Sequence, residues 1–105
     1  MRAKKSNVQR IVVDKDMTIY NVAVFKKQWL EALNQTSVLE LDLSQVAEID
    51  TAGIQLLILT KREAQLLART MAIVAHSPAV SDIIDFCNMA AYFGDPLLIQ
   101  ARETT

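Results

Sequence analysis

Several short stretches of the chain alternate apolar and polar residues or are continuously apolar, and these patterns predict β-strands. The clearest is Val38–Leu43, in which every second residue is a leucine. Val8–Val13 predicts a first strand, and Met17–Ile19 predicts a short second one. The charged residues 14–16 between them predict the turn of a hairpin. The apolar run Met71–Ala75 predicts an interior strand.

Two stretches have apolar residues at the spacing of a helix. Residues 22–34 predict an amphipathic helix with Asn21 as its N-cap and Trp29 in or at the rim of the core. A second helix is expected from about Ala52 to Arg69. Its apolar residues lie nearly all round the axis. Such a helix is covered on more than one face or offers an apolar surface to a partner.

The third helix has a start signal of its own. Ser77 precedes Pro78, which is the order of an N-cap followed by proline in the first helical position. Apolar residues then recur at positions i, i+3, i+4 and i+7. They predict one buried face, made by Val80, Ile83, Ile84 and Cys87.

The order of these elements predicts an α/β fold. Leu97–Ile99 adds a possible final edge strand, so the expected order is β-β-α-β-α-β-α-β. The opening hairpin makes the sheet mixed, with four to five strands. Residues 1–105 are expected to form a single domain in which residues 1–6 and 101–105 are flexible.

Composition excludes several classes of function. The apolar fraction of 51% argues against disorder, and the net charge of −1 gives no general reason to bind nucleic acid. No apolar run approaches the length of about 20 residues that a membrane span needs, and no signal peptide is visible, so we expect no direct membrane insertion and a cytoplasmic protein.

Residues that carry catalytic or metal chemistry are sparse. His76 is the single histidine and Cys87 the single cysteine, so no multi-histidine or zinc pattern exists and we expect no metal. On the predicted apolar face, Cys87 is expected to be a buried, inert thiol. The chain has two glycines and therefore no glycine-rich phosphate loop. We expect no cofactor and no enzyme activity.

The candidate site is the loop Ile49–Ile54, which joins a predicted strand to the second predicted helix. Its residues Asp50 and Thr51 lie at the start of that helix, where local rules favour them as caps. The first turn of a helix has unpaired N–H groups and the positive end of the helix dipole. A phosphate carried by a hydroxyl in this position would be stabilised there.

The segment Leu41–Leu57, with its Asp50-Thr51-Ala52-Gly53 loop, resembles the signature of the STAS family (sulfate transporter and anti-sigma-factor antagonist). The later segment His76–Val80 is similar to the Ser-Pro-x-Val helix start of that family. The resemblance covers essentially the whole chain. It implies a mixed sheet flanked by helices on one side.

The resemblance also implies a function. In antagonist members, the residue directly after the motif aspartate is phosphorylated, and here that residue is Thr51. The implied partners are an anti-sigma factor, which is a serine/threonine kinase of histidine-kinase-like ATPase fold, and a phosphatase of the PP2C type. The unmodified protein binds the anti-sigma factor, and phosphorylation releases it. The implied partner-binding residues are Asp50, Thr51, Ala52, Gly53, Ile54, Gln55 and Leu56.

One segment departs from the pattern of the antagonists, and this leaves an alternative open. Many of them have a Gly-x-Leu/Ile-Asp segment before the first helix, whereas this chain has Lys15–Tyr20 there. The Asp-Thr-Ala-Gly form of the loop also resembles STAS subunits of phospholipid-transport ABC complexes, which bind an ATPase without being phosphorylated. STAS proteins associated with chemotaxis or stress signalling have a similar loop.

Overall fold

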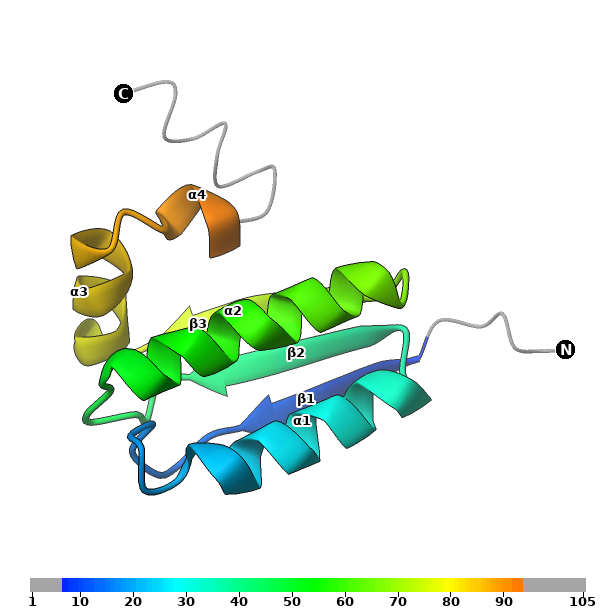
Figure 1. The fold of residues 1–105 in the computed structure, drawn as a ribbon, viewed down its shortest axis with the longest axis horizontal. Helices are drawn as coiled ribbons and strands as arrows, with labels where there is room; N and C mark the ends of the chain where they lie inside the picture. The colour runs from blue at the N-terminus through cyan, green and yellow to red at the C-terminus, as the bar shows by residue number, and fades with distance from the viewer. Residues whose placement is uncertain (1–6, 94–105) are drawn as a thin grey trace, which may run out of the picture.

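The computed structural model describes residues 7–93, in which three strands alternate with helices (Figure 1). In chain order the elements are β1 (Val8–Val12), α1 (Val22–Gln35), β2 (Val38–Leu43), α2 (Thr51–Leu66), β3 (Thr70–His76), α3 (Pro78–Phe86) and α4 (Ala90–Phe93).

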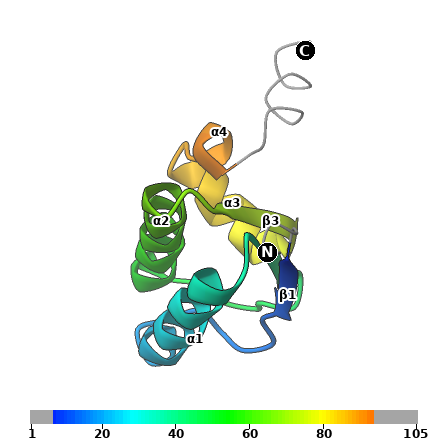
Figure 2. The same cartoon turned by 90° about the vertical axis from the view of Figure 1, so that its right-hand side faces the viewer.

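The three strands form one sheet in the order β1-β2-β3, with β2 in the centre. Both neighbouring pairs are parallel, and Ile11 of β1 and Ile73 of β3 lie opposite Leu41 on either side of β2. Helices α1 and α2 pack on the same face of this sheet (Figure 2). The predicted α/β fold, a sheet flanked by helices on one side, is confirmed.

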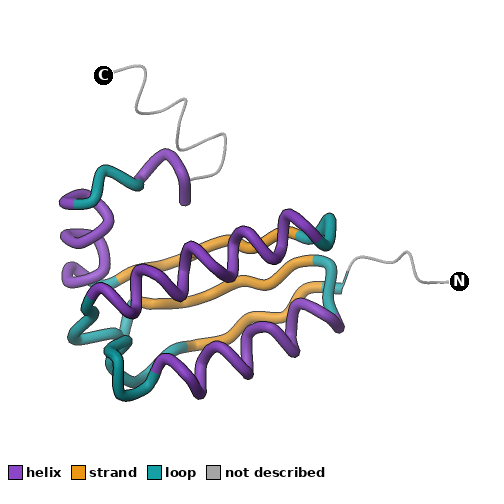
Figure 3. Tube along the Cα trace, in the orientation of Figure 1, coloured by secondary structure: helices purple, strands orange, loops and turns teal. Residues whose placement is uncertain are grey.

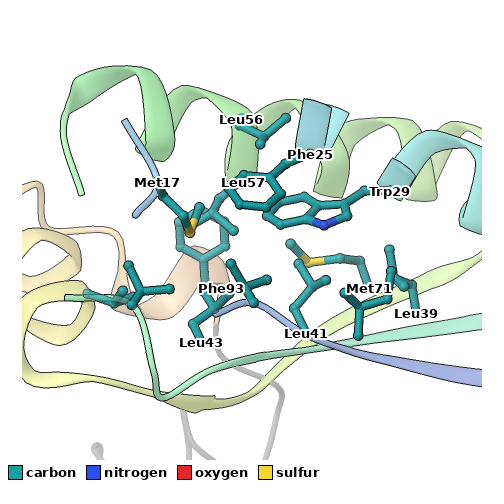
Figure 4. Close-up of a cluster of buried hydrophobic side chains, with 14 of the residues drawn as sticks. Met17, Phe25, Trp29, Leu39, Leu41, Leu43, Leu56, Leu57, Met71 and Phe93 are labelled. Atoms are coloured by element: carbon teal, nitrogen blue, oxygen red, sulfur yellow. The ribbon is translucent and has the colours of Figure 1, made fainter. Parts of the chain in front are cut away.

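The core lies between this face and the two helices. Alternation in β2 has the expected effect, because Leu39, Leu41 and Leu43 are fully buried while the residues between them are half-buried. Above them the Trp29 ring is fully buried and stacks on Phe25 with 5.6 Å between ring centroids (Figure 4). The predicted place of Trp29 in the core is confirmed.

The predicted hairpin is wrong. Instead of pairing back onto β1, Met17 forms an isolated parallel bridge with Ile49. The Met17 side chain is fully buried, and its N–H donates to the Glu48 carbonyl oxygen at 2.9 Å. Burial of this side chain therefore draws the segment onto the loop after β2. Within residues 7–93 the sheet has three strands, all parallel, rather than four to five in a mixed sheet.

Other predictions concern the edges of the fold. Strand β3 was expected in the interior but is an outer strand among residues 7–93. The predicted strand Leu97–Ile99 and the predicted flexible ends, 1–6 and 101–105, lie outside the described residues. Asn21 occupies the N-cap position of α1, but its side chain makes no capping hydrogen bond and instead donates to the Asp16 carbonyl oxygen at 2.8 Å.

Two helices end differently from the prediction. Helix α2 stops at Leu66, and Ala68 after it has a left-handed conformation with φ of 58°. Arg69, expected to be helical, instead donates from its guanidinium to the Leu33 carbonyl oxygen at 2.6 Å and to that of Thr36, at the end of α1. Helix α3 ends at Phe86, so Cys87 leaves the helical spacing and is exposed rather than buried.

Candidate functional site

The loops that follow β1 and β2 lie side by side at the carboxyl ends of the strands (Figure 3). In open α/β sheets this is the edge at which ligands bind. Loop 13–21 leads into α1, and loop 44–50 leads into α2. The predicted site at Asp50 and Thr51 therefore has two loops and two helix starts around it.

Asp50 joins these two loops through both of its carboxylate oxygens. One oxygen accepts a hydrogen bond from the Gly53 N–H at 3.2 Å and so caps the start of α2. The other accepts from the Ile19 N–H in the neighbouring loop at 3.0 Å. The expected N-cap role of Asp50 agrees with this geometry, and the bond to Ile19 also fixes loop 13–21 beside the start of α2.

Gly53 allows the two loops to approach closely. A Cβ built on Gly53 would clash with the carbonyl oxygen of Met17 and would lie 2.7 Å from Cγ1 of Ile49. The φ of Gly53 is not positive, so the glycine is required by space and not by backbone conformation. The Asp50 N–H also donates to the Met17 carbonyl oxygen, at 3.2 Å. The Met17 carbonyl oxygen thus packs directly against Gly53 and accepts a hydrogen bond from the Asp50 N–H, so both residues fix its position.

Thr51 is the first residue of α2, and its side chain is exposed. A kinase could therefore reach the hydroxyl without opening the core. A phosphate there would lie beside the first-turn N–H groups of α2, which favour an anion, and next to the carboxylate of Asp50, which opposes one. Thr51 is the one hydroxyl that combines these features at the predicted loop.

The predicted partner-binding residues have different degrees of exposure. Gln55 is exposed like Thr51, whereas Asp50 and Ala52 are half-buried. Gly53, Ile54 and Leu56 are buried. Thr51, Ala52 and Gln55 are therefore accessible enough to contact a partner directly. Gly53 and Ile54 instead pack beneath the start of α2 and support it.

A groove next to Thr51 was not predicted from the sequence. It has a volume of about 680 Å³, runs between the start of α1 and residues 52–62 of α2, and includes the buried Leu56 in its lining. Its other lining residues are mostly apolar, and Lys26 and Arg62 also line it. The sequence signal was the apolar surface predicted all round α2. That surface forms a groove only together with α1, and the sequence pattern does not predict where α1 lies relative to α2.

Asp42 at the end of β2 shows how loop 44–50 begins. One carboxylate oxygen of Asp42 accepts a hydrogen bond from the Ser44 hydroxyl at 2.6 Å and another from the Ser44 N–H at 2.9 Å. These two bonds stabilise the charged form and hold the pKa of Asp42 below its ordinary value of 3.8. Asp42 is therefore an anion that orders the loop turn.

Residues 7–93 contain no cluster of three or more histidine, cysteine or acidic side chains able to hold a metal ion. No helix within this range has the length and apolar character required to cross a membrane.

Comparisons with known proteins agree with the geometry. The structure is similar to that of the anti-sigma factor antagonist SpoIIAA in its unphosphorylated form, with a TM-score of 0.71 and 16% sequence identity over 95% of this chain and 89% of that one. It is also similar to the phosphorylated form of SpoIIAA, a Bacillus cell fate determinant, with a TM-score of 0.66 and 15% identity over 95% of this chain and 92% of that one. A search of curated proteins finds no match. A family model described as "Mlab, STAS domain" matches residues 1–99, and the chain therefore belongs to the STAS family.

Proposed function

We propose that the protein is an anti-sigma-factor antagonist that acts in the cytoplasm and is switched by phosphorylation of Thr51. The observation that carries the proposal is the position of Thr51, which is an exposed hydroxyl at the first residue of α2, beside a groove. Unmodified protein binds an anti-sigma factor, a kinase of histidine-kinase-like ATPase fold. Phosphorylation releases that partner, and a PP2C-type phosphatase restores binding.

The physical basis is a change of charge at a surface that otherwise stays folded. A phosphate adds roughly −1.5 to −2 charges at neutral pH. The first turn of α2 tolerates that charge, so the fold survives, but a partner packed against Thr51 and Ala52 meets both the repulsion and the cost of removing water from the phosphate. About 5.5 kcal/mol of differential binding moves a partner from 99% bound to 1% bound.

The experiment is intact-mass analysis of the protein isolated from its own cells with phosphatases inhibited. Wild type is expected to carry a phosphate that maps to Thr51 and is absent from Thr51→Ala. Thr60→Ala is the matched control, because Thr60 is buried in the same helix and its hydroxyl donates to the Leu56 carbonyl oxygen at 2.8 Å. Absence of the phosphate from wild type in both resting and stressed cells would contradict the proposal.

Binding to the purified anti-sigma factor provides the second half of the test. Thr51→Ala is expected to bind as wild type does and to resist the kinase, and Thr51→Asp is expected to bind much more weakly. Equal binding of the two variants would contradict switching by charge.

A second candidate function is a STAS subunit that is not phosphorylated, within a phospholipid-transport ABC complex or a chemotaxis-associated signalling complex. The observation in its favour is that the description of the matching family model names Mlab, whereas the similar structures are of SpoIIAA. In that case Thr51 contacts a permanent partner. A transport ATPase that copurifies with the protein, together with an unphosphorylated Thr51, would favour this candidate.

A further inference from the structure

We propose that the groove between α1 and α2 binds an amphipathic helix of a partner protein that carries acidic residues beside its apolar face. This names the chemistry of the partner at the proposed docking surface and in that respect rests on the proposed function. Three features of the groove support this partner: its open shape, its apolar base and the single sign of the charges along it.

The groove is an open surface and not an enclosed pocket. The lining residue Ile19 is 62% exposed, and the lining residues Ala23 and Gln55 are also exposed. Small-molecule sites bury most of the surface of their ligand, which a groove with such exposed walls does not do. A macromolecular partner can cover it.

The dimensions suit a helix. Along α2 the lining residues extend from Ala52 to Arg62, a separation of ten residue positions, or roughly 15 Å at about 1.5 Å per residue. That length matches about three turns of a partner helix. Ala23 of α1 and Ala52 of α2 both line the groove, and their small side chains permit close approach of another backbone.

The base of the groove is apolar without belonging wholly to the core. Leu56 is buried, whereas Val22 and Leu59 are half-buried. In Figure 4, Leu56 lies farther from the strands than its neighbour Leu57, which points into the core. A row of apolar side chains at positions i, i+3, i+4 and i+7 of a docked helix would cover this base.

The charges along the groove have one sign. Among residues 7–93, the lining contains two charged side chains, Lys26 from α1 and Arg62 from α2, and no carboxylate. Both are exposed and come from opposite walls. Carboxylates flanking the apolar face of the partner helix would pair with them. This complementarity selects acidic partners over basic ones and accelerates their association.

Because the groove selects a partner with negative charges, a phosphate on Thr51 can control binding at the groove. Thr51 precedes Ala52, the lining residue at one end of the groove, whereas Arg62 is eleven residues away, or roughly 16 Å along α2. That distance exceeds the screening length of about 8 Å at physiological salt, so Arg62 does not neutralise a phosphate on Thr51. By the same reasoning, a phosphate on Thr51 would repel partner carboxylates that dock near the start of α2, and not those that pair with Arg62.

The test uses two synthetic 18-residue helical peptides with the same leucine face. One has glutamate along both flanks of that face, and the other has lysine. Each is titrated into the isotopically labelled, unphosphorylated full chain and followed by NMR. We expect the glutamate peptide to shift the amide signals of groove residues on α1 and α2 and to bind about tenfold more tightly than the lysine peptide at low salt.

Charge reversal supplies the control. Lys26→Glu combined with Arg62→Glu is expected to reverse the preference between the two peptides. Lys27→Glu is the matched control, because Lys27 adjoins Lys26 on α1 and is exposed but lies outside the groove lining. That variant is expected to keep the preference of wild type.

Three outcomes would overturn the inference. They are equal binding of the two peptides, absence of saturable binding by either, and binding of phosphatidylglycerol vesicles with shifts at the groove in place of peptide binding. None of these measurements requires a kinase or a modified Thr51. A groove that prefers the glutamate peptide would therefore stand even if Thr51 were never phosphorylated in cells, and the phosphate could be found even if the groove preferred neither peptide.

Discussion

The carbonyl oxygen of Met17 occupies the space that a side chain on Gly53 would need. This contact joins loop 13–21 to the start of α2, where the candidate site lies. It also makes a substitution that is ordinarily favourable in a helix unfavourable here.

We predict that Gly53→Ala destabilises the protein by roughly 1–3 kcal/mol, the usual range for overpacking. Alanine is better than glycine in a helix by about 1 kcal/mol, so a loss of stability would show that the clash with Met17 outweighs this preference. Urea unfolding followed through the fluorescence of Trp29, the single tryptophan, measures the change. Gln55→Ala, at an exposed position of the same helix, is expected to stay within about 0.5 kcal/mol of wild type. A gain of stability from Gly53→Ala would contradict the prediction.

The two hydrogen bonds of Asp50 can be separated by substitution. Asp50→Ala removes both and is expected to cost about 1–2 kcal/mol, as loss of an N-cap does. The N–H of Ile19 loses its partner, so its hydrogen exchange is expected to accelerate. The N–H of Met17, in the same loop, donates to a backbone carbonyl oxygen and serves as an internal control with unchanged exchange.

Asp50→Asn distinguishes capping from loop attachment. Asparagine caps helices about as well as aspartate, but only one of its two side-chain groups is an acceptor. We expect the cap on Gly53 to persist and exchange at Ile19 to accelerate. Unchanged exchange at Ile19 in both variants would show that Asp50 does not hold loop 13–21.

The ends of α2 and α3 share a geometry but differ in the residue that occupies its left-handed position. Ala68 has φ of 58° and Asn88 has φ of 60°. In both, the next N–H bonds back to the helix, from Arg69 to the Ala64 carbonyl oxygen at 2.7 Å and from Met89 to that of Ile84 at 2.9 Å. This is the Schellman arrangement, in which glycine is the preferred residue.

We therefore predict that Ala68→Gly stabilises the protein by about 0.5–1 kcal/mol, because a left-handed conformation is costly for alanine and free for glycine. Asn88→Gly is expected to give a smaller gain, since asparagine adopts this conformation more readily. Urea unfolding of the two variants under the same conditions compares them. A larger gain at Asn88 than at Ala68 would contradict this explanation.

The same positions show what the sequence could and could not predict. Strand β2 was predicted from alternating leucines, and the start of α3 from Ser77-Pro78, because in each case the signal is local. The end of α2 was missed because Ala68 gives no glycine signal. The hairpin prediction failed because Met17 pairs with Ile49, which lies more than thirty residues farther along the chain. The groove was missed for a related reason, since it requires Lys26 and Arg62 from two different helices.

A last prediction concerns pH and the turn at Ser44. Since the folded-state pKa of Asp42 is lowered, its hydrogen bonds to Ser44 contribute stability above its ordinary pKa of 3.8, and this contribution is lost as pH falls through the lower, folded-state value.

Ser44→Ala removes the hydroxyl bond, which is the largest cause of the shift, and leaves the N–H bond. We expect the pKa of Asp42 to rise toward 3.8 in an NMR titration of its side chain, and stability to depend less steeply on pH below that value. Arg10→Ala is the comparison, because the charge of Arg10 is the smallest of the causes and Arg10 also pairs with Glu40 at 3.1 Å. A larger rise with Arg10→Ala than with Ser44→Ala would mean that charge, and not hydrogen bonding within the turn, keeps Asp42 ionised.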